Sequence, residues 1–315
     1  MQTKYRKKRD KAVCSKGRSG DIEMRKIKKS RQDIVLDIII YTILIMIGLV
    51  TLYPMWYVVA ASFTTTTELF SATGLFLWPK EFTATAYTMV FKDPLVLSGF
   101  KNILKIMLIS LPINIVMTML CGYFMASTGM KFKKPIIIFI LFTMYFSGGM
   151  IPAYLNIRDL GLMNTHWSII LSGAVSIYNS IICKTAIESI PDSLFESARI
   201  DGANDIIIMF KIVMPLIKPT LAVLLLYYGV GHWNSWFTAS IYLRENELLP
   251  LQNILRGILT ANQSSATSSL SASYDSYAET IKYALIVVSS VPIMCVYPFL
   301  QKYFTKGVMI GAVKG

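Results

Sequence analysis

Charged residues are scarce in this chain. They make up 16% of its 315 residues, whereas 54% are apolar. Several apolar runs are also too long for the core of a water-soluble domain. The shortage of charge and the length of these runs place the chain in the membrane class.

The sequence also offers few cysteines and no pattern of metal ligands. The four cysteines, Cys14, Cys121, Cys183 and Cys295, lack CxxC spacing, and three of them lie in apolar runs where a thiol acts as a small hydrophobe. His166 and His232 have no second ligand at metal spacing. We therefore expect no disulfide, no metal and no cofactor bound by this chain.

Catalytic motifs are missing as well. The sequence contains no Gly-Lys dipeptide, so it has no P-loop of the GxxxxGK[ST] kind and we expect no ATP hydrolysis by this chain. It also has no paired acid, HExxH or GxSxG arrangement, which argues against an intramembrane enzyme.

The positive charge is concentrated at the start of the chain. The net charge is +13, and 13 of the 31 Lys and Arg residues fall within the first 31 residues. Juxtamembrane basic clusters bind anionic headgroups, so we favour membrane lipid over nucleic acid as the partner of this arm. The apolar run at 34–61 is too long for the roughly 7–15 residues of a signal-peptide core. Residues 1–33 are predicted to form a basic cytoplasmic arm and residues 34–315 a transmembrane domain.

Six membrane-spanning helices are expected in an all-α domain. They are predicted near Ile34–Ser62, Gly99–Thr128, Pro135–Ile157, His166–Ser189, Thr220–Leu243 and Ile281–Phe304. Segments on the side of the N-terminus carry 22 Lys and Arg, and the opposite segments carry 5. The positive-inside rule then predicts a multi-pass protein of the cell membrane with both termini in the cytoplasm. Gly148-Gly149 and Pro152 predict a break near the outer end of the third span.

The loop at 190–219 is the most informative segment, and it is predicted to form a helix, a turn and a second helix. Ser189, Pro191 and Asp192 are typical of a helix start. Gly202 permits a tight turn, and Asn204 or Asp205 can cap a second helix.

The second helix of this loop is expected to carry Ile206, Met209 and Phe210 on an apolar face directed away from its own bundle. Pro215 and Pro219 are expected to end that helix. A partner protein would bury such a face. An interfacial loop lying on lipid headgroups is the alternative that the local pattern leaves open.

Two stretches of this loop, Glu196-Ser-Ala-Arg-Ile-Asp-Gly202-Ala203 and Phe210-Lys-Ile-Val-Met-Pro215, resemble the EAA loop of binding-protein-dependent ABC importer permeases. Ile151-Pro-Ala-Tyr-Leu155 and His232-Trp-Asn-Ser-Trp-Phe237 resemble the sugar branch of that family. The tail from Tyr297 to Gly315 is particularly similar to LplC/YtcP-type permeases for oligosaccharides and complex polysaccharides.

The resemblance implies a type I importer permease fold and an assembly for the import of carbohydrate. The assembly would contain a second permease subunit of different sequence, two ATPase subunits that bind ATP and Mg, and an extracytoplasmic sugar-binding protein. The ATPase-coupling residues carried over from the EAA loop are Glu196, Ala198, Asp201, Gly202, Ala203, Phe210 and Pro215.

A substrate path is predicted in the fifth span. Its candidate residues are Tyr228, His232, Trp233, Asn234 and Trp236. Aromatic faces stack on sugar rings, and amide and imidazole groups hydrogen-bond hydroxyls. The same residue types also form interfacial belts and interhelical contacts, so a packing role stays open.

An ion-coupled secondary transporter is the rival interpretation from another class. Such proteins need ionisable residues at membrane depth. Apart from His232, the predicted spans carry none near their middle, because Asp37, Lys184 and Glu188 lie at their cytoplasmic ends. Coupling from outside the chain, by an ATPase, is therefore favoured.

Thiol labelling tests the orientation. Cysteines introduced at Ser71 and Ser268 should react in intact cells with an impermeant reagent, and one at Ser19 should not, because the charge asymmetry places the N-terminal arm inside. Labelling at position 19 would overturn this topology.

Overall fold

The computed structural model describes residues 31–72, 74–129, 131–264 and 278–312, and these residues form helices without any β-strand. Ser19 and Ser268 of the labelling experiment, Cys14 and most of the basic arm lie outside the described residues, whereas Ser71 is exposed. The chain divides into two compact units, Met1–Pro54 and Met55–Gly315. Helix α2 (Arg31–Ala61) crosses from one unit to the next.

In the described part of the chain, three helices are long and apolar enough to cross a membrane, and all three were predicted. They are α2, α5 (Pro94–Ala126) and residues Glu279–Val296 of α17 (Ala278–Ala312). Asp93 caps α5 because its carboxylate accepts the Leu95 N–H at 2.8 Å, and Pro94 follows at the first helical position. The described residues hold up to five spans when each of two bent helix pairs counts as one.

The first bent pair is α6 (Lys133–Tyr145) and α7 (Met150–Asp159), which meet at 109°. The predicted break is confirmed, and Gly149 has a φ of 91°, which favours glycine. The second pair is the 205–216 segment and α13 (Lys218–Trp233), which meet at 88°. The short helix α14 (Trp236–Tyr242) continues the fifth predicted span after a break at Asn234 and Ser235.

The fourth predicted span is wrong as one continuous helix. Residues 166–189 form α8 (Trp167–Ser172) and α9 (Ile177–Glu188), separated by a non-helical link at 173–176. The hydroxyl of Ser176 caps α9 by accepting the Asn179 N–H at 3.3 Å. This link, called the α8–α9 link below, carries polar groups that need partners inside the bundle.

Short helices lie in residues 63–98 and 244–280, which the charge distribution predicts on the outer side of the membrane and which are called the outer segments below. They are α3 (Thr66–Ser71), α4 (Thr85–Lys92), the 3₁₀-helix η2 (Asn246–Leu248) and α15 (Leu251–Ser264). Glu68 fastens α3 to the following loop, because its carboxylate accepts the Thr64 hydroxyl at 2.7 Å and the Lys80 N–H at 2.5 Å. Burial raises the pKa of Glu68, but these hydrogen bonds and the Lys80 charge outweigh it and lower the pKa overall.

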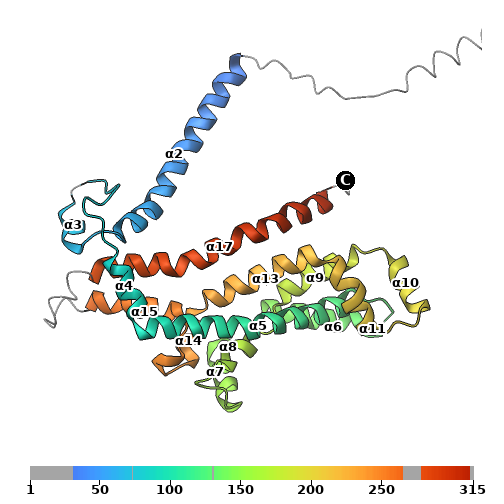
Figure 1. The fold of residues 1–315 in the computed structure, drawn as a ribbon. Coiled ribbons are helices and arrows are strands. Elements are labelled where there is room, and N and C mark those ends of the chain that lie inside the picture. The colour runs from blue at the N-terminus through green and yellow to red at the C-terminus, as the bar shows by residue number, and fades with distance from the viewer. Residues whose placement is uncertain (1–30, 73, 130, 265–277, 313–315) are drawn as a thin grey trace, which may run out of the picture. The chain divides into compact units, whose positions relative to one another are not determined.

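Helix α5 is the centre of the second unit (Figure 1). It packs against α9 and α13 along its length and against α15 near its start, and α17 packs on α13. Gly122 allows the closest approach of α5 and α9, because a Cβ there would lie 2.9 Å from Cβ of Cys183 and 3.2 Å from the Lys184 backbone nitrogen. The thiol of Cys183 is buried in this contact.

Gly122→Ala should therefore separate α5 from α9. We expect a loss of about 1–3 kcal/mol, the usual cost of overpacking, seen as a lower thermal denaturation midpoint of the detergent-purified protein. Gly257→Ala is the matched control, since nothing lies within 4 Å of a Cβ at that helical position. Equal midpoints for the two variants would contradict the close contact.

Candidate functional site

The first helix of the 190–219 loop is α10 (Asp192–Ile200), which begins one residue after Pro191. Asp192 lies in its first turn, as predicted. The expected capping role of Ser189 is wrong. Its hydroxyl donates to the Ala186 carbonyl at 2.7 Å, because Ser189 ends α9 and satisfies that helix instead.

The turn after α10 is a Schellman motif. Gly202 has a φ of 80°, and its N–H donates to the Arg199 carbonyl at 3.0 Å, while the Ala203 N–H donates to the Ala198 carbonyl at 2.9 Å. Ala198 is buried and Ala203 packs beside it in the bundle core. Small residues at both positions thus let the turn lie flat against the bundle.

The second helical stretch runs through α11 (Asp205–Ile207), the π-helix η1 (Ile208–Val213) and α12 (Met214–Leu216). Asn204 caps it by accepting the Ile207 N–H at 2.9 Å, which confirms one of the two predicted caps. The expectation that Pro215 and Pro219 end this stretch is wrong. Pro215 lies inside α12, which ends at Leu216, and Pro219 is the second residue of α13, because both prolines occupy the first turn of a helix, where no N–H is needed.

The predicted outward face of this stretch is only partly right. Ile206 is 64% exposed and Phe210 is also exposed, but Met209 is 2% exposed and packs in the bundle core. The π-helix explains the difference, because its i→i+5 bonding turns Ile208, Met209 and Val213 to the same inner side.

Asp205 joins the loop to the end of α5. Its carboxylate accepts the Tyr123 hydroxyl at 2.9 Å and lies 3.7 Å from the Arg199 guanidinium. The α10 and α11 helices lie together beyond this end of α5 (Figure 1). The sequence offered Asp205 only as a cap, and no local signal identified Tyr123 as its partner.

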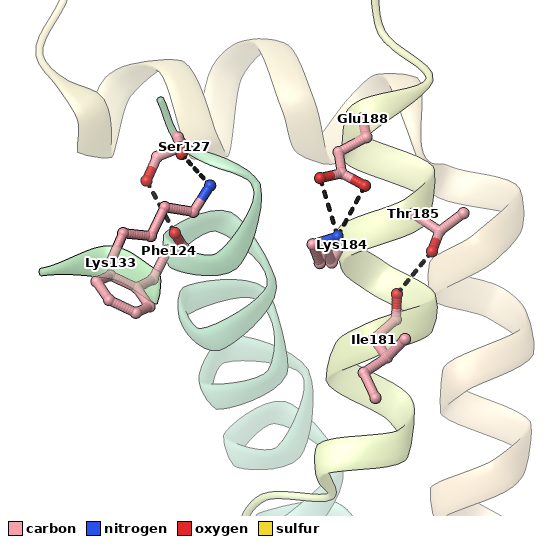
Figure 2. A network of polar contacts seen from close by, with 7 residues as sticks. All are labelled: Phe124, Ser127, Lys133, Ile181, Lys184, Thr185 and Glu188. Carbon is pink, nitrogen blue, oxygen red and sulfur yellow. Dashed lines mark hydrogen bonds and ion pairs between the residues drawn. The ribbon is translucent and has the colours of Figure 1, made fainter. Parts of the chain in front are cut away.

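A groove of about 370 Å³ separates α10 from the ends of α5 and α9. Its walls carry the carboxylates of Glu188, Asp192 and Glu196 beside the Arg199 guanidinium. Two residues that line the groove take part in the polar contacts of Figure 2: Lys184 pairs with Glu188 at 3.0 Å, and Lys133 donates to the carbonyl of Ser127 at the end of α5.

The seven predicted coupling residues therefore lie in one segment, 192–216, but they differ in exposure. Glu196, Asp201, Gly202, Phe210 and Pro215 are exposed, Ala203 is half-buried, and Ala198 is buried. The exposed set, with Ile200 and Ile206, forms the outer surface of the segment 192–216, called the loop surface below.

A second cavity, of about 360 Å³, lies between the α8–α9 link, α13 and α14. Tyr228 and His232 line it, together with Ser176 and Asn179. The other predicted path residues do not. Asn234 is exposed at the end of α13, and Trp236 lies under the Arg256 guanidinium, 3.5 Å from the ring centre.

Trp233 is in the packed interior. Its indole is 5% exposed, its N–H donates to the Ser289 carbonyl of α17 at 3.1 Å, and its ring meets Phe100 edge-on at 6.4 Å. Trp233 therefore has the surroundings of a packing residue, the alternative that the sequence left open.

A buried polar network borders this cavity, and part of it was not foreseen. Asn114 of α5 donates its amide hydrogens to the Gly173 carbonyl at 2.6 Å and the Ala174 carbonyl at 3.1 Å, and its Oδ1 lies 2.9 Å from Nε2 of His232. The hydroxyl of Tyr228 accepts the Ser176 N–H at 3.0 Å and is hydrogen-bonded to the Thr118 hydroxyl at 2.6 Å. The α8–α9 link is thereby held by α5 and α13.

The long apolar helices, with backbone groups at their breaks held by side chains and a capped helical loop at one end, fit a subunit embedded in a membrane. A family model described as "Binding-protein-dependent transport system inner membrane component" matches residues 96–310. The chain belongs to this family, the membrane component of ABC transporters.

Two curated relatives from Bacillus subtilis (strain 168) match most of the chain. The polygalacturonan/rhamnogalacturonan transport system permease protein YtcP is 37% identical over 281 residues, 89% of this chain and 98% of YtcP. Protein LplC is 38% identical over 270 residues, 85% of this chain and 91% of LplC.

A solved structure shares the fold. A chain of a bacterial ABC transporter involved in the import of the acidic polysaccharide alginate is 31% identical and has a TM-score of 0.81, covering 89% of this chain and 100% of that chain. The predicted fold class, an all-α importer permease, is confirmed.

The burial of Trp233 yields a stability prediction. Trp233→Ala should lower the free energy of unfolding by about 3–5 kcal/mol, because a large core side chain is removed. Thermal denaturation of the purified protein measures this, with the exposed Phe237→Ala as control. Equal midpoints for the two variants would show that Trp233 does not pack in the interior.

Proposed function

We propose that this chain is one permease subunit of an ATP-driven importer that moves an oligosaccharide or a polysaccharide fragment into the cytoplasm. The observation that carries the proposal is the identity of 37–38% with YtcP and LplC over 85–89% of the chain. YtcP is named for polygalacturonan and rhamnogalacturonan, and the solved relative belongs to a transporter involved in the import of alginate. Polymeric carbohydrate is the substrate class common to both.

The proposed assembly contains a second permease chain of different sequence, two ATPase subunits and an extracytoplasmic sugar-binding protein. The ATPase subunits bind ATP and Mg, since this sequence has no P-loop. The protein is proposed to cross the cell membrane several times with both termini in the cytoplasm. The Lys and Arg distribution, 22 against 5, supports this orientation.

The loop surface is the proposed contact with an ATPase subunit. Its helices are fixed from behind by Ala198, Met209 and the Tyr123–Asp205 hydrogen bond, so it can be displaced as one body. It exposes Ile206 and Phe210, which a protein partner would remove from water. The Glu196 carboxylate, which is exposed on α10 at the edge of the groove, would meet a basic group of the partner.

Transport then follows from alternating access. ATP binding draws the two ATPase subunits together, the loop surface moves with its ATPase, and the two permease chains open outward to receive sugar from the binding protein. The cavity at Tyr228 and His232 is the proposed part of the substrate path in this chain. Its hydroxyl, amide and imidazole groups suit a hydrogen-bonded carbohydrate.

Charge reversal and a turn substitution test the docking. Glu196→Lys should weaken ATPase association by about 2 kcal/mol, roughly 30-fold, because like charges would face each other. Gly202→Val should act in the same direction, since a side chain at a φ of 80° costs about 1–2 kcal/mol. Copurification of the ATPase with tagged permease is the measurement.

Two matched variants serve as controls for this experiment. Glu247→Lys makes the same charge change at an exposed position in the predicted outer segment and should keep normal copurification. Gly202→Asn should be milder than Gly202→Val, because asparagine tolerates the left-handed region. Normal ATPase copurification and sugar uptake in Glu196→Lys would favour a loop that lies on lipid headgroups instead.

A further inference from the structure

The geometry around Asn114 fixes the hydrogen positions on His232. The side-chain nitrogen of Asn114 faces two backbone carbonyls, Gly173 at 2.6 Å and Ala174 at 3.1 Å, and only an NH₂ group can donate to both. Oδ1 of Asn114 is therefore the atom that faces Nε2 of His232 at 2.9 Å. An amide oxygen only accepts, so Nε2 of His232 must carry the hydrogen.

The second ring nitrogen of His232 is then a hydrogen-bond acceptor. In a neutral imidazole with its hydrogen on Nε2, Nδ1 holds a lone pair. No hydrogen-bond partner for Nδ1 is found among the described residues. Although His232 as a whole is only 7% exposed, its Nδ1 is not one of the buried side-chain atoms that lack a partner in the described part of the chain, so it is accessible from the 360 Å³ cavity that His232 lines. An accessible acceptor at a cavity wall can take a hydrogen bond from a molecule bound in the cavity.

The cavity chemistry indicates which donor fits. None of the described residues that line it is charged, and Ser172, Ser176, Asn179 and Thr238 supply hydroxyl and amide groups. Resting on the proposed function, we infer that Nδ1 of His232 accepts a hydrogen bond from a hydroxyl group of the transported carbohydrate. Asn114 is the positioning residue, because its amide holds the imidazole in the accepting tautomer.

While the imidazole is neutral, this arrangement favours a hydroxyl group over a carboxylate at the same point. A carboxylate has no hydrogen to give, so its oxygens would face the Nδ1 lone pair with repulsion. An acidic sugar would consequently turn a hydroxyl edge of its ring toward His232. The carboxylate would be placed away from it.

Binding of radiolabelled trigalacturonate to the complete importer complex in lipid nanodiscs tests the contact. His232→Gln keeps a nitrogen donor for Asn114 but removes the acceptor at Nδ1, so it should weaken binding about five-fold, the effect of one hydrogen bond. The same factor is expected for the methyl ester of trigalacturonate. An unchanged affinity, or an effect confined to the free acid, would overturn the inference.

Nitrogen spectroscopy tests the positioning role. The chain has two histidines, so ¹⁵N-histidine labelling of the permease gives few signals. The His232 signals should show hydrogen on Nε2, the Nδ1 resonance should move when trigalacturonate is added, and Asn114→Ala should yield a mixture of tautomers. Hydrogen on Nδ1 in the wild type, or an Nδ1 resonance that ignores the sugar, would contradict the proposal.

Two failures remain distinguishable. Carbohydrate import itself would be contradicted if the wild-type complex bound neither trigalacturonate nor maltotriose and also failed to take up either sugar together with its binding protein. A wild-type complex that takes up trigalacturonate while His232→Gln binds it equally well would leave the proposed function intact and refute the role of His232.

Discussion

Backbone hydrogen bonding at the helix breaks is the constraint on which the second unit depends. Inside the hydrocarbon core of a bilayer no water can satisfy a free N–H or C=O group, so a break needs partners from the surrounding protein or from a water-filled cavity. At the α8–α9 link these partners are Asn114 and Tyr228, which reach it from α5 and α13. After α13, the Ser235 hydroxyl performs the same task by donating to the His232 carbonyl at 2.7 Å.

Helix α5 supplies much of this support. Asn102, Asn114, Thr118 and Gly122 are spaced by multiples of four residues, and each step of four advances about 40° around the helix, so the row winds from one side of α5 to the other. Near the start of the helix, Asn102 donates to the carbonyls of Glu247 and Leu249, at 2.6 and 3.1 Å. Farther along the row, Asn114 and Thr118 hold the cavity wall, and Gly122 admits α9. A single helix thereby sets the positions of elements that are far apart in sequence.

The sequence was most predictive where structure is decided locally. Gly202 and Asn204 were foreseen because a turn and a cap depend on a few neighbouring residues, and the Gly148-Gly149 break for the same reason. Ser189 and Met209 were misjudged because each was claimed by a competing element, the end of α9 and the inner side of η1.

Long-range contacts set the limit of the sequence interpretation. The α8–α9 link contains no proline, and it persists because Asn114 and Tyr228 satisfy it from distant helices. Trp233 looked like a stacking residue beside His232, yet one step along α13 turns it toward α17. Neighbouring aromatic residues on a helix cannot be assigned to cavity or core without knowing which face the bundle covers.

Helix α13 begins at Lys218, directly after the corner that ends the 192–216 segment, and reaches His232 within its 16 residues. At a rise of 1.5 Å per residue, it spans about 24 Å. Because it is continuous, a small rotation at the corner becomes a larger sideways excursion at its far end. The length of this one helix therefore sets how far the cavity wall at His232 moves for a given rotation at the corner before Lys218.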